Sequence, residues 1–264
     1  MLRHSSLFQF RHGDHTCVFY RDEELLREVL VPYIADGLRN GERCFCAQKP
    51  YVGRQLLYDL NFLGIDTESA IRRGALEIHT EDEVYFPQKH FSPTDMMEML
   101  AESIDDASAK GFTGFRSAGE LSWAVEGRND CDKVLGYEKM VDEYFPGKHA
   151  IGLCQYNMDA FTPEMLQAVM ESHRLHVSEK RPNCMHAGIS IRRGAYSAEI
   201  VADKLMVDPN YYYVVQQNRP QQILGWGVAG TFDKANQQAE NVMAVAATEQ
   251  KASASWQNDE PHFA

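Results

Sequence analysis

Short apolar runs alternate with amphipathic segments along the first two thirds of the chain. The apolar runs predict β-strands at residues 15–20, 43–47, 75–78, 112–116 and 150–156. The amphipathic segments carry apolar residues at helical spacing and predict helices at residues 22–40, 52–63, 92–111, 130–144 and 162–173. Asp22, Ser92 and Thr162 are the predicted capping residues, and proline follows the last two. Strands that alternate with helices predict an α/β fold with a mainly parallel sheet and helices on both faces.

The pattern changes beyond residue 180. Prolines and glycines interrupt residues 181–231, which predicts an irregular extension packed on the core, with Cys184–Ile191 as one candidate strand. Residues 232–252 are rich in Ala, Gln and Glu and predict a C-terminal helix, and residues 253–264 predict a disordered tail. The predicted organisation is therefore one α/β domain at residues 10–180, followed by these three segments.

Composition narrows the class of protein. The 264 residues are 44% hydrophobic and carry a net charge of −12, from 26 basic and 38 acidic side chains. No apolar run reaches the roughly 18 residues that cross a bilayer, and the N-terminus lacks the apolar region of a signal peptide, so we expect a cytoplasmic protein. The acidic balance argues against a nucleic-acid surface that covers the whole molecule, although a local basic patch stays open. The six cysteines form no Cys-x-x-Cys pair and give no support for a structural zinc site.

Polar and aromatic side chains follow the carboxyl ends of the predicted strands, where open parallel sheets bind ligands. These side chains include Tyr20, Arg116, Glu120, Trp123, Gln155 and Tyr156. Arg116 and Glu120 form either an ion pair at a pocket rim or an ordinary surface pair. We expect Gln155 and Tyr156 to line one wall of a pocket opposite Tyr20.

Enzyme signatures are absent from the sequence. No G-x-x-x-x-G-K-[ST] segment follows the first strand, which argues against nucleotide hydrolysis. His15 and Cys17 lie two apart on one strand and face the same way, as a base with a thiolate, as soft metal ligands, or as a buried thiol beside a hydrogen-bonded histidine. The last interpretation is favoured, so we expect no catalytic residue, no metal and no cofactor.

A helix-turn-helix is one further possibility for DNA contact. Leu25 to Cys44 contains Gly37 at a possible turn. The second helix would contain Gly41 and end in β-prone residues, which makes it a poor recognition helix.

Several motifs together resemble the MEDS domain, a sensory domain of methanogens, methylotrophs and the dichloromethane repressor. They are H-x-C-x-x-Y at 15–20, N-G-E-R-C at 40–44, F-R-S-A-G-E-L-S-W at 115–123, G-Y-E at 136–138, L-C-Q-Y-N at 153–157 and E-S-H at 171–173. The resemblance spans roughly residues 10 to 180, with the motifs in the expected order. It implies a RecA/KaiC-type α/β core that lacks a phosphate-binding loop.

The resemblance also implies a function. Members of the MEDS family are thought to sense simple hydrocarbon derivatives. The family is not an enzyme family, so the resemblance implies no catalytic residue in this chain. A chain of this kind would be a homodimeric repressor that binds operator DNA at a dichloromethane dehalogenase gene and at its own gene, with the helix from Phe232 as the expected dimer interface. A small halogenated hydrocarbon or its metabolite would relieve repression. The alternative is a sensory adaptor that binds a protein partner. The ligand-binding residues that carry over are His15, Cys17, Tyr20, Arg116, Glu120, Trp123, Cys154, Gln155 and Tyr156.

Overall fold

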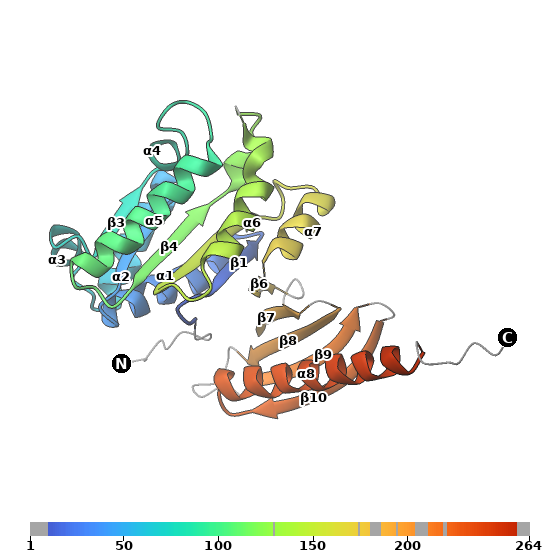
Figure 1. Ribbon diagram of the computed structural model, residues 1–264. Helices are drawn as coiled ribbons and strands as arrows, with labels where there is room; N and C mark the ends of the chain where they lie inside the picture. Colours follow the sequence, from blue (N-terminus) through green and yellow to red (C-terminus); the bar gives the residue numbers. More distant parts are fainter. Residues whose placement is uncertain are drawn as a thin grey trace. The chain divides into compact units, whose positions relative to one another are not determined.

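The computed structural model describes residues 10–128, 130–173, 175–179, 186–193, 195–203, 211–218 and 221–257. The chain divides into two compact units, residues 1–179 and residues 180–264. In the first unit a parallel sheet has the strand order β6-β1-β5-β4-β2-β3 (Figure 1). Its strands are β1 (His15–Tyr20), β2 (Arg43–Ala47), β3 (Leu76–His79), β4 (Phe115–Glu120), β5 (Ala150–Asn157) and β6 (Leu175–Glu179).

Helices cover both faces of this sheet, which confirms the predicted α/β architecture. One face carries α1 (Glu23–Arg39) and α2 (Pro50–Phe62), and the other carries α5 (Pro93–Ala109), α6 (Val134–Tyr144) and α7 (Pro163–Ser172) (Figure 1). The short helices α3 (Thr67–Arg72) and α4 (Glu81–Tyr85) flank β3, and two 3-10 turns cover Ser122–Val125 and Cys131–Lys133. The main hydrophobic core lies between the sheet and the layer of α5, α6 and α7.

Side-chain caps explain where three of the helices begin. The Asp22 carboxylate accepts a hydrogen bond from Leu25 N at 2.8 Å at the start of α1. The hydroxyls of Ser92 and Thr162 accept the equivalent bonds at α5 and α7, each at 3.3 Å. Each cap satisfies a backbone N–H that has no partner inside the helix, and all three predicted starts are confirmed.

The structure corrects two predictions in the first unit. The strand expected at residues 112–116 is β4 at Phe115–Glu120, because Phe112 N still closes the end of α5 on Ala107 O. The helix expected from residue 130 begins as a 3-10 turn, and α6 starts at Val134. The first shift places Arg116 inside the strand rather than after it.

The window Leu25 to Cys44 does not form a helix-turn-helix. Its first part is the single helix α1, and its last residues belong to β2 in the middle of the sheet. Gly37 lies inside α1, where a Cβ atom would come within 2.7 Å of Cys44 Sγ. This glycine allows the helix to approach the sheet closely and makes no turn, so the window offers no recognition helix.

The second unit is an antiparallel sheet with one long helix. Its strands are β7 (His186–Arg193), β8 (Tyr196–Asp203), β9 (Tyr211–Asn218) and β10 (Gln221–Ala229), paired in sequence order, and α8 (Phe232–Gln257) packs against β8, β9 and β10. The segment expected to be an irregular extension, residues 181–231, therefore contains four regular strands, and the prediction is wrong there. Pro209 and Pro220 do not interrupt these strands, because both prolines lie outside the strand ranges and outside the described residues. The predicted C-terminal helix is confirmed and runs through residues 253–257 of the expected tail, whereas residues 258–264 and Cys184 lie outside the described ranges. None of the helices in the described ranges could span a membrane.

Candidate functional site

The residues predicted to bind a ligand fall on two opposite faces of the sheet. Side chains alternate along a strand, so neighbours in sequence point to different faces. The face under α5, α6 and α7 receives His15, Cys17, Cys154 and Tyr156, and the face under α1 receives Tyr20, Arg116, Glu120 and Gln155. Trp123 follows β4 and packs in the core against Tyr85 and Phe91. Gln155 and Tyr156 therefore do not share a wall opposite Tyr20.

On the face under α6, five polar side chains form a buried cluster, which we call the His15–Glu138 cluster. It consists of His15, Glu138, Cys154, Tyr156 and His173. Glu138 Oε2 lies 3.2 Å from His15 Nε2 and 3.0 Å from His173 Nε2. Tyr156 donates its hydroxyl to Glu138 Oε1 at 2.7 Å, and Cys154 Sγ lies 3.3 Å from His15 Nε2. The side chains of both histidines and of Glu138 are at most 1% exposed.

Four separate elements bring these side chains together. β1 carries His15 and its neighbour β5 carries Cys154 and Tyr156, in a parallel register that places Cys17 opposite Cys154. Glu138 lies on the buried side of α6. His173 caps the C-terminal end of α7, where its Nδ1 lies 2.9 Å from Val169 O. The cluster is thus a seam between the sheet and the two helices α6 and α7.

The cluster holds a carboxylate between two imidazoles. Burial opposes the ionisation of Glu138, but the charges of nearby His173 and His15 outweigh it and hold the pKa of Glu138 well below its usual range. Burial also opposes a charged His15, whereas Asp142 and Glu138 raise the pKa of that imidazole above its ordinary value. Burial, followed by the charge of Glu138, raises the pKa of the Cys154 thiol far above neutral. A thiolate nucleophile therefore gains no support from this environment.

The cluster also has the composition of a metal-binding group. His15, Glu138, Cys154 and His173 each offer one ligand atom, and these atoms all lie within 4.8 Å of one another. Glu138 and His173 were missed as site residues by the sequence analysis. The signal was present in the motifs G-Y-E at 136–138 and E-S-H at 171–173, but motif order alone does not show which side chains converge.

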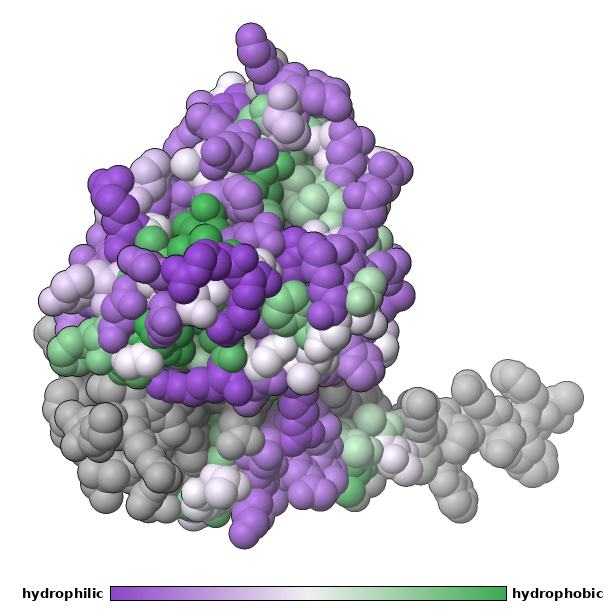
Figure 2. Space-filling view, turned by 90° about the vertical axis from the view of Figure 1, so that its left-hand side faces the viewer, coloured by the Kyte–Doolittle hydropathy of each residue, from purple (hydrophilic) through white to green (hydrophobic). Residues whose placement is uncertain are grey.

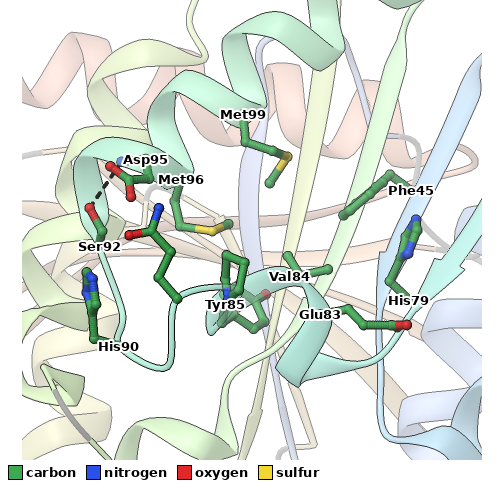
Figure 3. A pocket seen from close by; sticks show the side chains of 12 residues that line it. Phe45, His79, Glu83, Val84, Tyr85, His90, Ser92, Asp95, Met96 and Met99 are labelled. Carbon is green, nitrogen blue, oxygen red and sulfur yellow. Dashed lines mark hydrogen bonds between the residues drawn. The ribbon is translucent and has the colours of Figure 1, made fainter.

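An apolar pocket lies on the same face, between α4, α5 and β2. Its cavity volume is about 270 Å³, and Figure 3 shows Met96, Met99, Tyr85 and Phe45 around it with polar groups such as Ser92 at its margin. A smaller inner cavity of about 30 Å³ shares these four apolar residues. This inner cavity is also lined by His15 and Cys154, so it lies beside the His15–Glu138 cluster. Figure 2 shows apolar side chains recessed among hydrophilic ones on the side of the molecule that it faces.

The opposite face of the sheet holds a second set of buried polar groups. Tyr20 donates its hydroxyl to Glu120 Oε1 at 3.1 Å, and Ser122 also donates to this oxygen. Burial, together with the hydrogen bond and charge of Glu120, raises the pKa of Glu81 to about 9. Gln155 is fully buried, and neither polar atom of its side chain has a hydrogen-bond partner in the described ranges.

Arg116 does not pair with Glu120. Its Nε donates to Glu42 Oε2 at 2.5 Å, its Nη1 donates to Tyr33 O at 2.8 Å, and its guanidinium lies over the Tyr33 ring at 4.7 Å. Arg116 is only 3% exposed because it lies inside β4 rather than after it. The predicted pair of Arg116 with Glu120 is therefore wrong both as a pocket-rim pair and as a surface pair, because Arg116 pairs with Glu42 beneath α1, away from the apolar pocket.

Comparison with known proteins gives one family match and one curated relative. The family model described as MEDS, the methanogen/methylotroph, DcmR sensory domain, matches residues 14–174, which include the whole His15–Glu138 cluster. The transcriptional repressor DcmR of Methylorubrum extorquens (strain DSM 6343 / CIP 106787 / DM4) is 26% identical over 166 residues, which is 61% of this chain. The match spans 58% of that relative.

Two solved structures share the general chain path at low identity. The KaiC-like protein PH0186 from Pyrococcus horikoshii OT3 has a TM-score of 0.46 and 11% identity, over 73% of this chain and 86% of that one. The flagellar accessory protein FlaH from Methanocaldococcus jannaschii has a TM-score of 0.43 and 10% identity, over 83% and 91%. Both TM-scores are below 0.5, so neither structure supports an assignment of fold or function to this chain.

Proposed function

The chain belongs to the MEDS family, and from that premise we propose that it is a transcriptional repressor whose α/β domain binds a small hydrocarbon derivative. A repressor as relative supports the regulatory role. Its targets would be operators at a dichloromethane dehalogenase gene and at its own gene, bound as a homodimer. Dichloromethane, another small halogenated hydrocarbon or a metabolite would release it. Regulation, rather than an enzyme activity, is the role that we propose.

The apolar pocket is the observation that carries the ligand-binding part of this proposal. Ligand pockets are mostly apolar with a few placed polar groups, and for drug-sized ligands they measure about 300–1,000 Å³. The cavity of about 270 Å³ is near the lower end of that range, and a second cavity of about 30 Å³ shares part of its lining. A ligand of a few heavy atoms fits this shape better than a nucleotide does.

A gel-shift titration tests both parts of the proposal. The purified chain should bind DNA that carries its own promoter, binding should weaken as salt rises, and dichloromethane or a related compound should release the DNA. Met99→Trp would fill the pocket and should raise the ligand concentration for half-release at least about tenfold, equivalent to about 1.4 kcal/mol. Met140→Trp is the matched control, because Met140 is 40% exposed on α6.

The dose response also distinguishes the two faces of the sheet. An unchanged dose response in Met99→Trp would show that the ligand does not bind in the apolar pocket. If Tyr20→Ala or Gln155→Ala then blunted release, the ligand would bind on the face under α1 instead. A gel shift that shows no release with any compound would contradict the sensing role itself.

A sensory adaptor that binds a protein is the second candidate function. The charge of −12 disfavours a broad DNA surface. In addition, Trp226 on β10 has a side chain that is 75% exposed, next to Val228, which is 47% exposed on the same strand face. Exposed aromatic residues are enriched at protein interfaces. The absence of a gel shift at low salt, with or without ligand, would favour this adaptor over the repressor.

A further inference from the structure

We propose that the His15–Glu138 cluster binds a divalent transition metal, with zinc as the best fit, through His15 Nε2, Glu138 Oε2, Cys154 Sγ and His173 Nε2. This inference rests on the geometry of the cluster and holds whether or not the chain represses a gene. No metal was expected from the sequence, because it has no Cys-x-x-Cys pair and because His15 and Cys17 were interpreted as a buried thiol beside a hydrogen-bonded histidine. The four ligands instead come from β1, α6, β5 and the end of α7.

Three of the six separations among the four ligand atoms are close to the edges of a tetrahedral site, and all six are within 4.8 Å. Zinc binds nitrogen and oxygen at about 2.0–2.2 Å and sulfur at about 2.3 Å, which separates its ligand atoms by about 3.3–3.6 Å along the tetrahedron edges. Glu138 Oε2 lies 3.0 Å from His173 Nε2 and 3.2 Å from His15 Nε2, and His15 Nε2 lies 3.3 Å from Cys154 Sγ. These three separations would need to lengthen by at most a few tenths of an ångström to reach the tetrahedral values.

The orientation of the atoms also indicates a shared central ligand. Glu138 Oε2 and His173 Nε2 are buried and close, yet within the described part of the chain neither has a partner in hydrogen-bond geometry. Buried polar atoms without hydrogen bonds are rare in proteins because each costs free energy. An ion at the centre of the cluster would satisfy both atoms at once.

Outer hydrogen bonds hold two of the ligands, His173 and Glu138, with the required atom free. The other nitrogen of His173, Nδ1, lies 2.9 Å from Val169 O, and the other oxygen of Glu138 accepts the Tyr156 hydroxyl at 2.7 Å. His15 Nδ1 faces Asp142 Oδ1 at 3.6 Å. Hydrogen bonds from a metal ligand to a neighbouring carbonyl or hydroxyl are typical of metal sites, where they fix the histidine tautomer and orient the ligand.

The ligand set favours zinc among the common metals. Two imidazoles and one thiolate are borderline and soft ligands that suit zinc, which also accepts one carboxylate, whereas magnesium and calcium require oxygen ligands. Cys154 would bind as a thiolate and release its proton to solvent, as thiols do when they bind metals. Four protein ligands make a closed coordination shell of the kind found in structural sites.

Metal analysis and cobalt substitution test the inference on the full chain under reducing conditions. We expect about one zinc per chain as isolated, and a cobalt-loaded protein with intense ligand-field bands of a tetrahedral site and a thiolate-to-cobalt charge-transfer band. Cys154→Ser should abolish that charge-transfer band. Cys17→Ser should retain it, and it is the matched control because Cys17 lies opposite Cys154 in the pairing of β1 with β5, faces the same side of the sheet and is outside the proposed ligand set.

Tyr156→Phe provides a milder test in case Cys154→Ser does not fold. It removes only the outer hydrogen bond to Glu138 and should weaken metal affinity about 10–100-fold. Circular dichroism of each variant shows whether it is folded. The inference is overturned if the folded wild-type chain contains no stoichiometric metal and binds neither zinc nor cobalt saturably. Equal loss of the charge-transfer band in both cysteine variants would also overturn it.

Discussion

Replacing Arg116 by methionine should destabilise the first unit by about 3–5 kcal/mol. The guanidinium and the Glu42 carboxylate form an ion pair whose side chains are only 4% and 5% exposed. Removing one member of such a pair leaves the other charge buried without compensation, which costs about 3–5 kcal/mol. Since each 1.4 kcal/mol changes an equilibrium tenfold, the folded-to-unfolded ratio should fall by two to nearly four orders of magnitude.

Two further contacts determine how much stability the second substitution, Glu42→Gln, restores to Arg116→Met. Glu42→Gln combined with Arg116→Met removes both charges, so the double variant should be more stable than the sum of the two single losses predicts by at least about 2 kcal/mol. Recovery should be incomplete. Arg116 also donates to Tyr33 O, and Glu42 Oε1 contacts His12 Nε2 at 3.0 Å.

Urea unfolding followed by tryptophan fluorescence measures these losses. Trp123 is fully buried in the first unit, so a background in which phenylalanine replaces Trp226 and Trp256 makes the signal specific to that unit. Arg27→Met is the matched control because its pair with Asp59 is exposed at the arginine, and it should cost less than about 1 kcal/mol. A loss in Arg116→Met no larger than in this control would refute a buried, structural role for the pair.

Two more predictions concern close packing and pH. Gly37→Ala should lower the free energy of unfolding by about 1–3 kcal/mol, because the new Cβ would lie 2.7 Å from Cys44 Sγ. Gly136→Ala is the control and should raise it by up to about 1 kcal/mol, because the new Cβ would meet no atom within 4 Å. Equal melting temperatures of the two variants would contradict the close packing of Gly37. The raised pKa of Glu81 means that the folded chain holds its proton more tightly than the unfolded chain, so this stabilisation is complete below pH 4.5 and is lost as pH rises toward about 9. Measured by urea unfolding, the free energy of unfolding should decline less steeply with pH in Glu81→Gln than in the wild-type chain. An equal decline in the two proteins would contradict the raised pKa of Glu81.

The architecture of the first unit could be predicted because its signals are local. Asp22, Ser92 and Thr162 act on the backbone three residues away, so the helix starts follow from short segments of sequence. The apolar runs likewise predict strands that are buried under helices on both sides. In the second unit the same reasoning failed, because glycines and prolines were taken to interrupt elements although Gly225 lies within β10, at a shift in its register with β9.

The candidate site was less predictable because it depends on which face each side chain meets. The alternation within one strand correctly places His15 and Cys17 on the same face. It does not show which helix covers that face, so Glu138 on α6 stayed unrecognised. Starting β4 three residues too early had a second effect, since it placed Arg116 at an open edge rather than under α1.

The position of the cluster bears on how a very small ligand could operate the proposed repressor. A ligand of three heavy atoms supplies at most about 4.5 kcal/mol, whereas a complete switch between two states needs about 5.5 kcal/mol of differential affinity. The ligand must therefore act where little motion is needed. His15 and Cys154 line the inner cavity from the sheet, while Glu138 and His173 reach the same cluster from α6 and α7. A ligand that binds beside this seam would favour the state in which the distance between the sheet and the helices α6 and α7 suits it better. A small difference in that distance is the conformational change that we expect so small a ligand to select.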